Sequence, residues 1–287
     1  MLSPGIATGF YDRHHKQLRK FFLRTVRTIG VAKDEKEQKI AVEAQILAER
    51  FASHAGSGKP YNPYFDLALT ASNVSCTHLF GKTYARDDKD FQECVTLTLL
   101  VFETCGAAGY VNLFPGLIHL PISTNRKMKE WMRQTIDKFY QPIIDEHVKT
   151  LDLNNNTAPR DLIDAFLLEI KNKEDCSEPH PFNMSGLVDL MADLFAASTD
   201  TTFAASRWLF LLMVKYPDVQ KRIQDELDDV VGRQRMPCYA DRVNLPYLQA
   251  ATVEGLRLSC IGPFGKLKHV SCFIDISFLG LKSPPLL

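Results

Sequence analysis

Residues 185–216 contain no proline and only one glycine, Gly186. A helix over these 32 residues would be about 48 Å long at 1.5 Å per residue, and Pro217 would end it. Apolar residues are distributed around most of it: Leu187, Val188, Leu190, Leu194, Phe195, Phe203, Trp208, Leu209, Leu211, Leu212 and Val214. A helix that is apolar on most sides runs through the middle of a large domain. The stretch therefore predicts a mainly α-helical domain built around one central helix.

The rest of the chain also follows a helical period, with no internal repeat and no low-complexity tract. Proline, glycine and asparagine clusters mark the connections between helices. The predicted helices are 12–29, 37–54, 62–79, 86–107, 124–150, 159–172, 184–216, 217–231 and 246–260.

Composition excludes several classes of protein. The 34 basic and 34 acidic residues balance, so there is no basic excess that would favour nucleic acid as a partner. The seven cysteines are scattered, without zinc-site spacing, which indicates reduced thiols in a protein that faces the cytosol. No signal peptide and no run of about eighteen apolar residues is present, so the chain is expected to be soluble or cytoplasmic as it stands. We expect the sequons at Asn73, Asn155 and Asn183 to occur by chance.

The middle of the long helix carries the run Ala-Ala-Ser-Thr-Asp-Thr-Thr over residues 196–202. Hydroxyl side chains are poor choices inside a helix, because they bond back to carbonyl oxygens and bend the helix. Ala197 and Thr201, four residues apart, form a flank of low bulk that a flat ligand could approach; a groove for helix packing is the alternative. Asp200 beside Thr201, in a buried bend, suggests a pair that delivers protons.

The first predicted helix has a stripe of basic residues on one face: Arg13, Lys16, Lys20, Arg24 and Arg27. Such a stripe is usually solvated, although it could also dock an acidic surface or anionic lipid. His15 and Arg19 point instead to the side that carries Phe22, Val26 and Ile29. An arginine on an apolar face needs an anion. That anion could be a carboxylate of the chain or of a ligand.

Near the end of the chain, Glu254 and Arg257 are three residues apart on a predicted helix, where they can pair. The pattern is weak, because Glu130 and Arg133 repeat it elsewhere and are expected to form an ordinary surface pair.

Three segments in this order resemble the cytochrome P-450 superfamily of haem-thiolate monooxygenases, in particular its animal microsomal branch. Residues 11–20 are similar to the family's Trp-x-x-x-Arg helix, 194–202 to its long oxygen-binding helix, and 254–257 to its Glu-x-x-Arg helix. The resemblance implies a partial P-450 helical domain with little β structure over 1–265. Residues 266–287 lack the likeness, and we expect them to be poorly ordered or strand-like.

The resemblance also implies roles for single residues. Arg19 would hold a haem propionate, with His15 standing where the family has tryptophan, and Ala197 would lie against the porphyrin. Asp200 and Thr201 would be catalytic, protonating dioxygen at the iron. Glu254 and Arg257 would form a structural ion pair near the haem.

The sequence departs from the family in one decisive way. It contains no Phe-x-x-Gly-x-Arg-x-Cys-x-Gly loop, which supplies the thiolate ligand of the iron. Neither Cys260 nor Cys272 lies in a similar setting. We therefore expect a fragment without an axial cysteine, truncated at both ends, whose membrane anchor would precede residue 1.

Two functions remain open at this point. The first is the family's oxygen insertion into a lipophilic substrate, with electrons from an NADPH-dependent reductase at the cytosolic face of the endoplasmic reticulum; the isolated chain would be inactive. The second is a non-catalytic helical fragment that binds a lipophile or a redox partner weakly. An unrelated all-α ligand-binding receptor would share the apolar helices but not the three ordered motifs.

Overall fold

A computed structural model describes residues 6, 12–29, 34–105, 130–152, 158–176 and 178–261. Its helices are α1 (Arg13–Ile29), α2 (Asp34–His54), α3 (Tyr64–Phe80), α4 (Lys89–Cys105), α7 (Gln141–Thr150), α8 (Leu162–Asn172), α9 (Met184–Lys215), α10 (Pro217–Val230) and α11 (Pro246–Ser259), with a π-helical turn η2 (Ile136–Tyr140) and a 3-10 turn η3 (Tyr239–Asn244). These ranges contain no strand, which confirms the mainly α class. The predicted tail, 266–287, lies outside the described residues.

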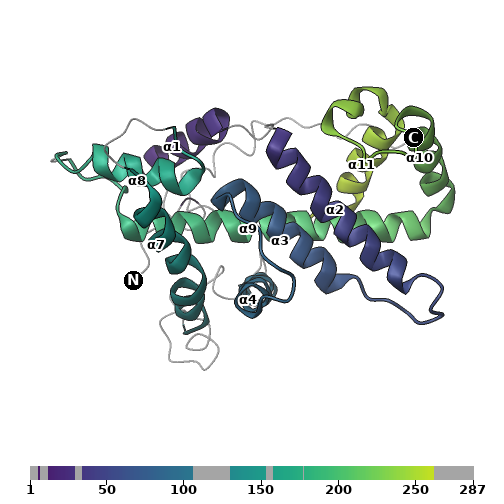
Figure 1. The fold of residues 1–287 in the computed structure, drawn as a ribbon, viewed down its shortest axis with the longest axis horizontal. Coiled ribbons are helices and arrows are strands. Elements are labelled where there is room, and N and C mark those ends of the chain that lie inside the picture. The colour runs from purple at the N-terminus through teal and green to yellow at the C-terminus, as the bar shows by residue number, and fades with distance from the viewer. Residues whose placement is uncertain are drawn as a thin grey trace, which may run out of the picture.

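The predicted central helix is α9, which runs the length of the molecule in Figure 1, with α1, α7 and α8 at one end and α10 and α11 at the other. The helix α3 packs along α9, α2 packs on α3, and α4, α8, α10 and α11 also contact α9. Four apolar side chains of α9 are completely buried: Leu187, Leu190, Met191 and Phe195. The apolar sequence of α9 thus organises the whole bundle.

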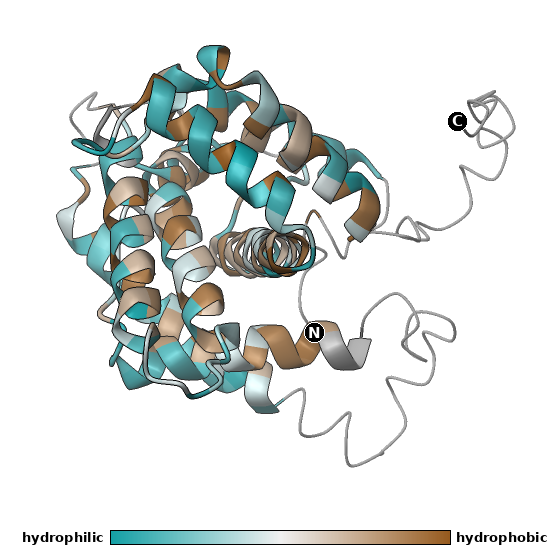
Figure 2. Ribbon diagram, turned by 90° about the vertical axis from the view of Figure 1, so that its right-hand side faces the viewer, coloured by the Kyte–Doolittle hydropathy of each residue, from teal (hydrophilic) through white to brown (hydrophobic). Residues whose placement is uncertain are grey.

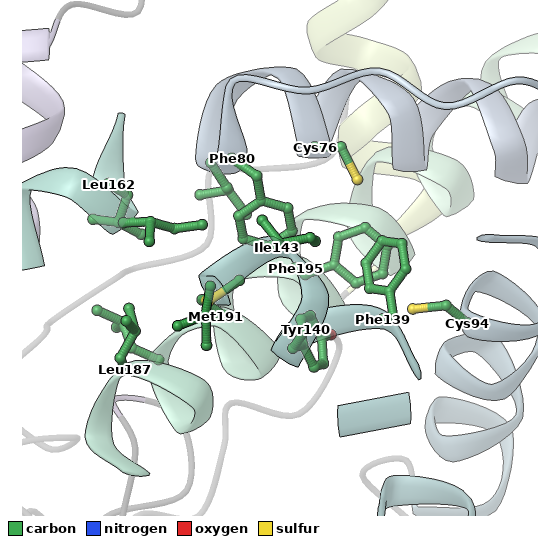
Figure 3. Close-up of a cluster of buried hydrophobic side chains, with 14 of the residues drawn as sticks. Cys76, Phe80, Cys94, Phe139, Tyr140, Ile143, Leu162, Leu187, Met191 and Phe195 are labelled. Carbon is green, nitrogen blue, oxygen red and sulfur yellow. The ribbon is translucent and has the colours of Figure 1, made fainter. Parts of the chain in front are cut away.

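An aromatic cluster fills the core between α3, α9 and η2 (Figure 3). The rings of Phe80 and Phe195 stack with centroids 6.1 Å apart, and Phe139 lies 5.8 Å from Phe195. Sequence predicts an unbroken helix over 124–150, whereas the structure has the π turn η2 within it. A π turn inserts an extra residue, and here the neighbours Phe139 and Tyr140 are both buried.

The described cysteines are free thiols, as predicted. Cys76 and Cys94 lie inside the core beside the aromatic cluster (Figure 3). Burial raises the pKa of both thiols well above its ordinary value, so both stay protonated and unreactive. Cys176, Cys238 and Cys260 are exposed.

A polar network ties α2, α3 and the following loop together. Asn73 is fully buried and donates to Glu43 Oε1 and to the carbonyl of Tyr84, each at 2.9 Å, while its own Oδ1 accepts from the Tyr84 N–H. Arg86 donates to Glu43 Oε2 at 3.0 Å. Because every polar atom of the Asn73 side chain is engaged, a glycan on Asn73 is incompatible with this network.

Gly186 of α9 and Gly255 of α11 give expectations of different size for replacement by alanine. In an ordinary helix, alanine is favoured over glycine by about 0.5–1 kcal/mol. A Cβ on Gly186 would overlap the backbone carbonyl oxygen of Pro181, whereas a Cβ on Gly255 meets only the end of the Leu209 side chain at 2.5 Å. A side-chain end can rotate away, but a backbone carbonyl cannot.

We therefore expect Gly186→Ala to lower the free energy of unfolding by about 1–3 kcal/mol, and Gly255→Ala to lower it by less. Urea denaturation followed by circular dichroism measures both. A Gly186→Ala variant as stable as the unmodified chain would show that the first turn of α9 is packed differently.

Candidate functional site

The Ala197–Thr201 flank is exposed on α9. Thr201 Oγ1 donates to the carbonyl of Ala197 at 2.8 Å, and Ser198 Oγ donates to the carbonyl of Phe195 at 3.2 Å. The hydroxyls thus bond back to the helix, as expected, yet α9 stays α-helical without interruption. The prediction of a buried bend is wrong here, because the hydroxyls reach their carbonyls within regular helix geometry and the flank faces away from the core.

The opposite side of α9 is packed. Phe195, Thr199 and Phe203 are buried, and Asp200, between Thr199 and Thr201, is half-buried. Figure 2 looks along α9 and shows the described helices on three sides of it, with α11 above and α4 below. Both of these helices contact α9. Within residues 196–202, Thr199 therefore faces the core, whereas Ala197 and Thr201 form an exposed side of low bulk.

Arg19 and His15 lie differently from each other on α1. His15 is buried, with Nε2 3.1 Å from the carbonyl oxygen of Ile6, whereas Arg19 is exposed. The expectation that Arg19 points inward is wrong, because the buried face of α1 is centred on Leu18, Phe21 and Thr25, about 100° away around the helix. An exposed guanidinium does not need an anion from the chain, and it stays available to one from a ligand.

The basic stripe of α1 is exposed, and two of its members pair within the chain. Arg13 forms an ion pair with Glu178, and Arg24 lies 3.2 Å from Glu169. The apolar face of the same helix contacts α8, where the Phe21 and Phe166 rings meet edge to face at 5.3 Å.

Glu254 and Arg257 form the predicted pair on α11. Arg257 Nε donates to Glu254 Oε2 at 2.7 Å and its terminal nitrogen donates to Oε1 at 2.6 Å. The guanidinium holds the pKa of Glu254 below its usual range. Both side chains are exposed. The comparison pair also forms, with Arg133 2.9 Å from Glu130, so pairing alone does not distinguish α11.

The position of α11 depends on a residue that the sequence reasoning missed. Glu226 of α10 accepts hydrogen bonds from the N–H groups of Tyr247 and Leu248 in the first turn of α11, both at 2.8 Å. Leu245, at the N-cap, offers no side-chain acceptor, so a carboxylate from another helix satisfies these donors. Further along α11, the buried Gly255 lies against Leu209 of α9. No local pattern connects residue 226 to residue 247.

A family model described as cytochrome P450 matches residues 3–284. The chain belongs to the cytochrome P450 family. Among its P450 relatives, "Cytochrome P450 2J3" of Rattus norvegicus is 34% identical over 272 residues, which cover 94% of this chain and 52% of the relative. "Cytochrome P450 2C8" of Homo sapiens is 34% identical over 252 residues, with 87% and 50% covered. The chain spans about half the length of these P450 relatives.

The described residues fit part of a haem environment. The open Ala197–Thr201 flank has the low bulk that a flat macrocycle requires, and the exposed Arg19 offers a fork that matches a carboxylate. Of the described cysteines, Cys76 and Cys94 are buried in the core, and Cys176, Cys238 and Cys260 are on the surface. Cys105 and Cys272 fall outside the described side chains. None of the described helices is long and apolar enough to span a bilayer.

We expect Glu226→Gln to destabilise the packing of α11. The amide keeps one acceptor but turns an NH₂ group toward a backbone N–H, and the negative charge at the helix N-terminus is lost, so the free energy of unfolding should fall by about 1–2 kcal/mol. Urea denaturation measures the loss.

Asp229→Asn is the matched control, because Asp229 is exposed on the same helix. Equal effects of the two substitutions would mean that Glu226 acts only through its general charge.

Proposed function

We propose that this chain is part of a haem-dependent monooxygenase and that its α9 helix forms one wall of the haem site. The observation that carries the proposal is the exposed, low-bulk flank at Ala197 and Thr201, in the middle of the central helix α9. Bound haem would supply the oxygen chemistry, inserting one oxygen atom into a lipophilic substrate. The residues of this chain would bind and orient the haem and deliver protons.

The acid–alcohol pair would move the protons. Thr201 Oγ1 gives its own hydrogen to the Ala197 carbonyl, so its lone pairs are left to accept a hydrogen bond on the open side of α9. Asp200, half-buried and next in sequence, would exchange protons with water on that side. Ala197 would let the macrocycle approach the backbone.

The remaining predicted residues would have binding and structural roles. Arg19 would pair with a propionate through its exposed fork. His15, which is buried and contacts the Ile6 carbonyl, would stabilise the position of α1. Glu254 and Arg257 would brace α11, which Glu226 and Gly255 fix against α10 and α9.

We further propose that these 287 residues alone hold no thiolate-ligated haem and do not turn over substrate. The sequence has no cysteine in the family's ligand motif. The whole protein would act at the cytosolic face of the endoplasmic reticulum with an NADPH-dependent reductase.

The second candidate is a non-catalytic helical fragment that binds a redox partner, and the exposed stripe on α1 favours it. Glu178 and Glu169 already engage Arg13 and Arg24. The charge left for a partner is therefore smaller than the sequence pattern indicates, which makes this candidate the weaker of the two.

A reduced carbon-monoxide spectrum tests the proposed absence of a thiolate-ligated haem. The purified chain is mixed with hemin, reduced with dithionite and exposed to carbon monoxide, with human "Cytochrome P450 2C8" as the positive control. We expect no red-shifted Soret band from the chain, because that band requires a thiolate ligand.

A red-shifted band would contradict the proposed absence of a thiolate. Cys260→Ser then identifies the ligand, since Cys260 is exposed directly after α11. Loss of the band in this variant would assign it to Cys260.

A further inference from the structure

A buried charged corner lies where the end of α3 meets α7 and α8. His147 of α7 is only 8% exposed, and Asp161, the N-cap residue of α8, is 3% exposed. Both α3 and α7 contact α8. The C-cap glycine of α3, Gly81, approaches so closely that a Cβ there would lie 3.1 Å from Asp161 Oδ2. The site is remote in sequence from every residue assigned to the haem wall.

Both ring nitrogens of His147 face acceptors. Nδ1 lies 2.7 Å from the carbonyl oxygen of Ile143, and Nε2 lies 2.8 Å from Asp161 Oδ2. A neutral imidazole has one N–H and can donate only one of these hydrogen bonds, whereas an imidazolium donates both. The other Asp161 oxygen accepts the N–H groups of Ile163 and Asp164 at 2.9 and 3.1 Å.

The other charges around the corner are already matched. Asp164, completely buried, receives Arg160 Nε at 2.5 Å, its terminal nitrogen at 2.8 Å and its backbone N–H at 3.1 Å. On the α7 side, the exposed Glu146 is paired with Lys82, which follows α3, at 2.7 Å. His147 is thus the side chain that contacts Asp161 Oδ2, and a neutral ring would remove its positive charge from beside this buried carboxylate.

We propose that His147 is a buried imidazolium that acts as a pH-sensitive latch, holding α7 and the start of α8 against the end of α3. When the ring carries two protons, it donates hydrogen bonds to both the Ile143 carbonyl and the Asp161 carboxylate. Loss of one proton places a nitrogen lone pair against either the Ile143 carbonyl or the Asp161 carboxylate. That hydrogen bond is then lost, and the packing of α7 and α8 against the end of α3 weakens. The latch is independent of haem and of the proposed oxygen chemistry.

The direction in which stability depends on pH follows from the raised pKa of His147. Burial by itself lowers the pKa of the ring, but the hydrogen bond and charge of Asp161, together with the Ile143 carbonyl, outweigh burial and raise the pKa above 6.5. A folded-state pKa above the unfolded value stabilises the fold fully below the unfolded pKa of about 6.5. The stabilisation is lost as pH rises from there through the folded pKa.

A bound metal ion is the competing explanation for the same residues. Ligand atoms of His147, Asp161 and Asp164 all lie within 4.8 Å of one another. A metal would need the lone pair of Nε2 and would release its proton. It would also have to share Asp164 with the Arg160 guanidinium, so the contacts favour the proton.

The test compares urea midpoints of the full chain, His147→Gln and His54→Gln between pH 6 and 9. His54 is the matched control, because it is exposed and its Nδ1 also contacts a carbonyl four residues back, that of Arg50, at 2.8 Å. Between pH 6.5 and the folded pKa of His147, the equilibrium constant for unfolding should rise more steeply in the unmodified chain and in His54→Gln than in His147→Gln. We expect the difference to be up to about ten-fold per pH unit. Parallel curves for all three would overturn the proposal.

Two further measurements do not need the His147→Gln variant, and a third, with Zn²⁺, compares that variant with the unmodified chain. Nitrogen-15 NMR of the unmodified chain at pH 6 should show both His147 ring nitrogens protonated; a single protonated nitrogen at that pH overturns the latch. Asp161→Asn keeps a good N-cap but removes the charge, and should lower the His147 pKa. Added Zn²⁺ should leave the midpoint of the unmodified chain unchanged, and a rise that disappears in His147→Gln would establish the metal site instead.

Discussion

The packing of α3 against α9 is the contact on which the rest of the molecule depends. The rings of Phe80 and Phe195 stack within it, and the π turn η2 adds Phe139 and Tyr140 to the same cluster. One side of α9 is committed to this core, which leaves Ala197 and Thr201 on the other side. The division of one helix into a packed side and an open side is what makes a ligand-binding wall possible.

Buried and half-buried charges join the helices at their ends. Glu226 satisfies the first turn of α11, Asp161 caps α8 and engages α7, and Arg86 ties the loop after α3 to Glu43 of α2. Each contact crosses between elements, so it fixes direction and register where apolar packing alone would tolerate sliding.

The helices were predictable because their boundaries are local. Proline and glycine mark the ends, and the apolar period of α9 is visible in its own residues. The P450 family and the Glu254–Arg257 pair were also correctly predicted. The inward Arg19 and the buried bend at Thr201 were not, because whether a position at the edge of a helix face is covered depends on neighbouring helices. Glu226 and the His147–Asp161 contact were missed because partners 21 and 14 residues apart leave no local pattern. The catalytic and haem roles remain predictions.

The burial of Asn73 has a consequence for how the chain is made. Its amide bridges Glu43 and Tyr84 only after three segments have come together. Before that moment, the same asparagine is an open acceptor sequon on a nascent polypeptide. An oligosaccharide attached then would occupy the place of the network and prevent its closure. Biosynthesis of this fold therefore requires that folding around residue 73 precede, or never encounter, the glycosylation machinery.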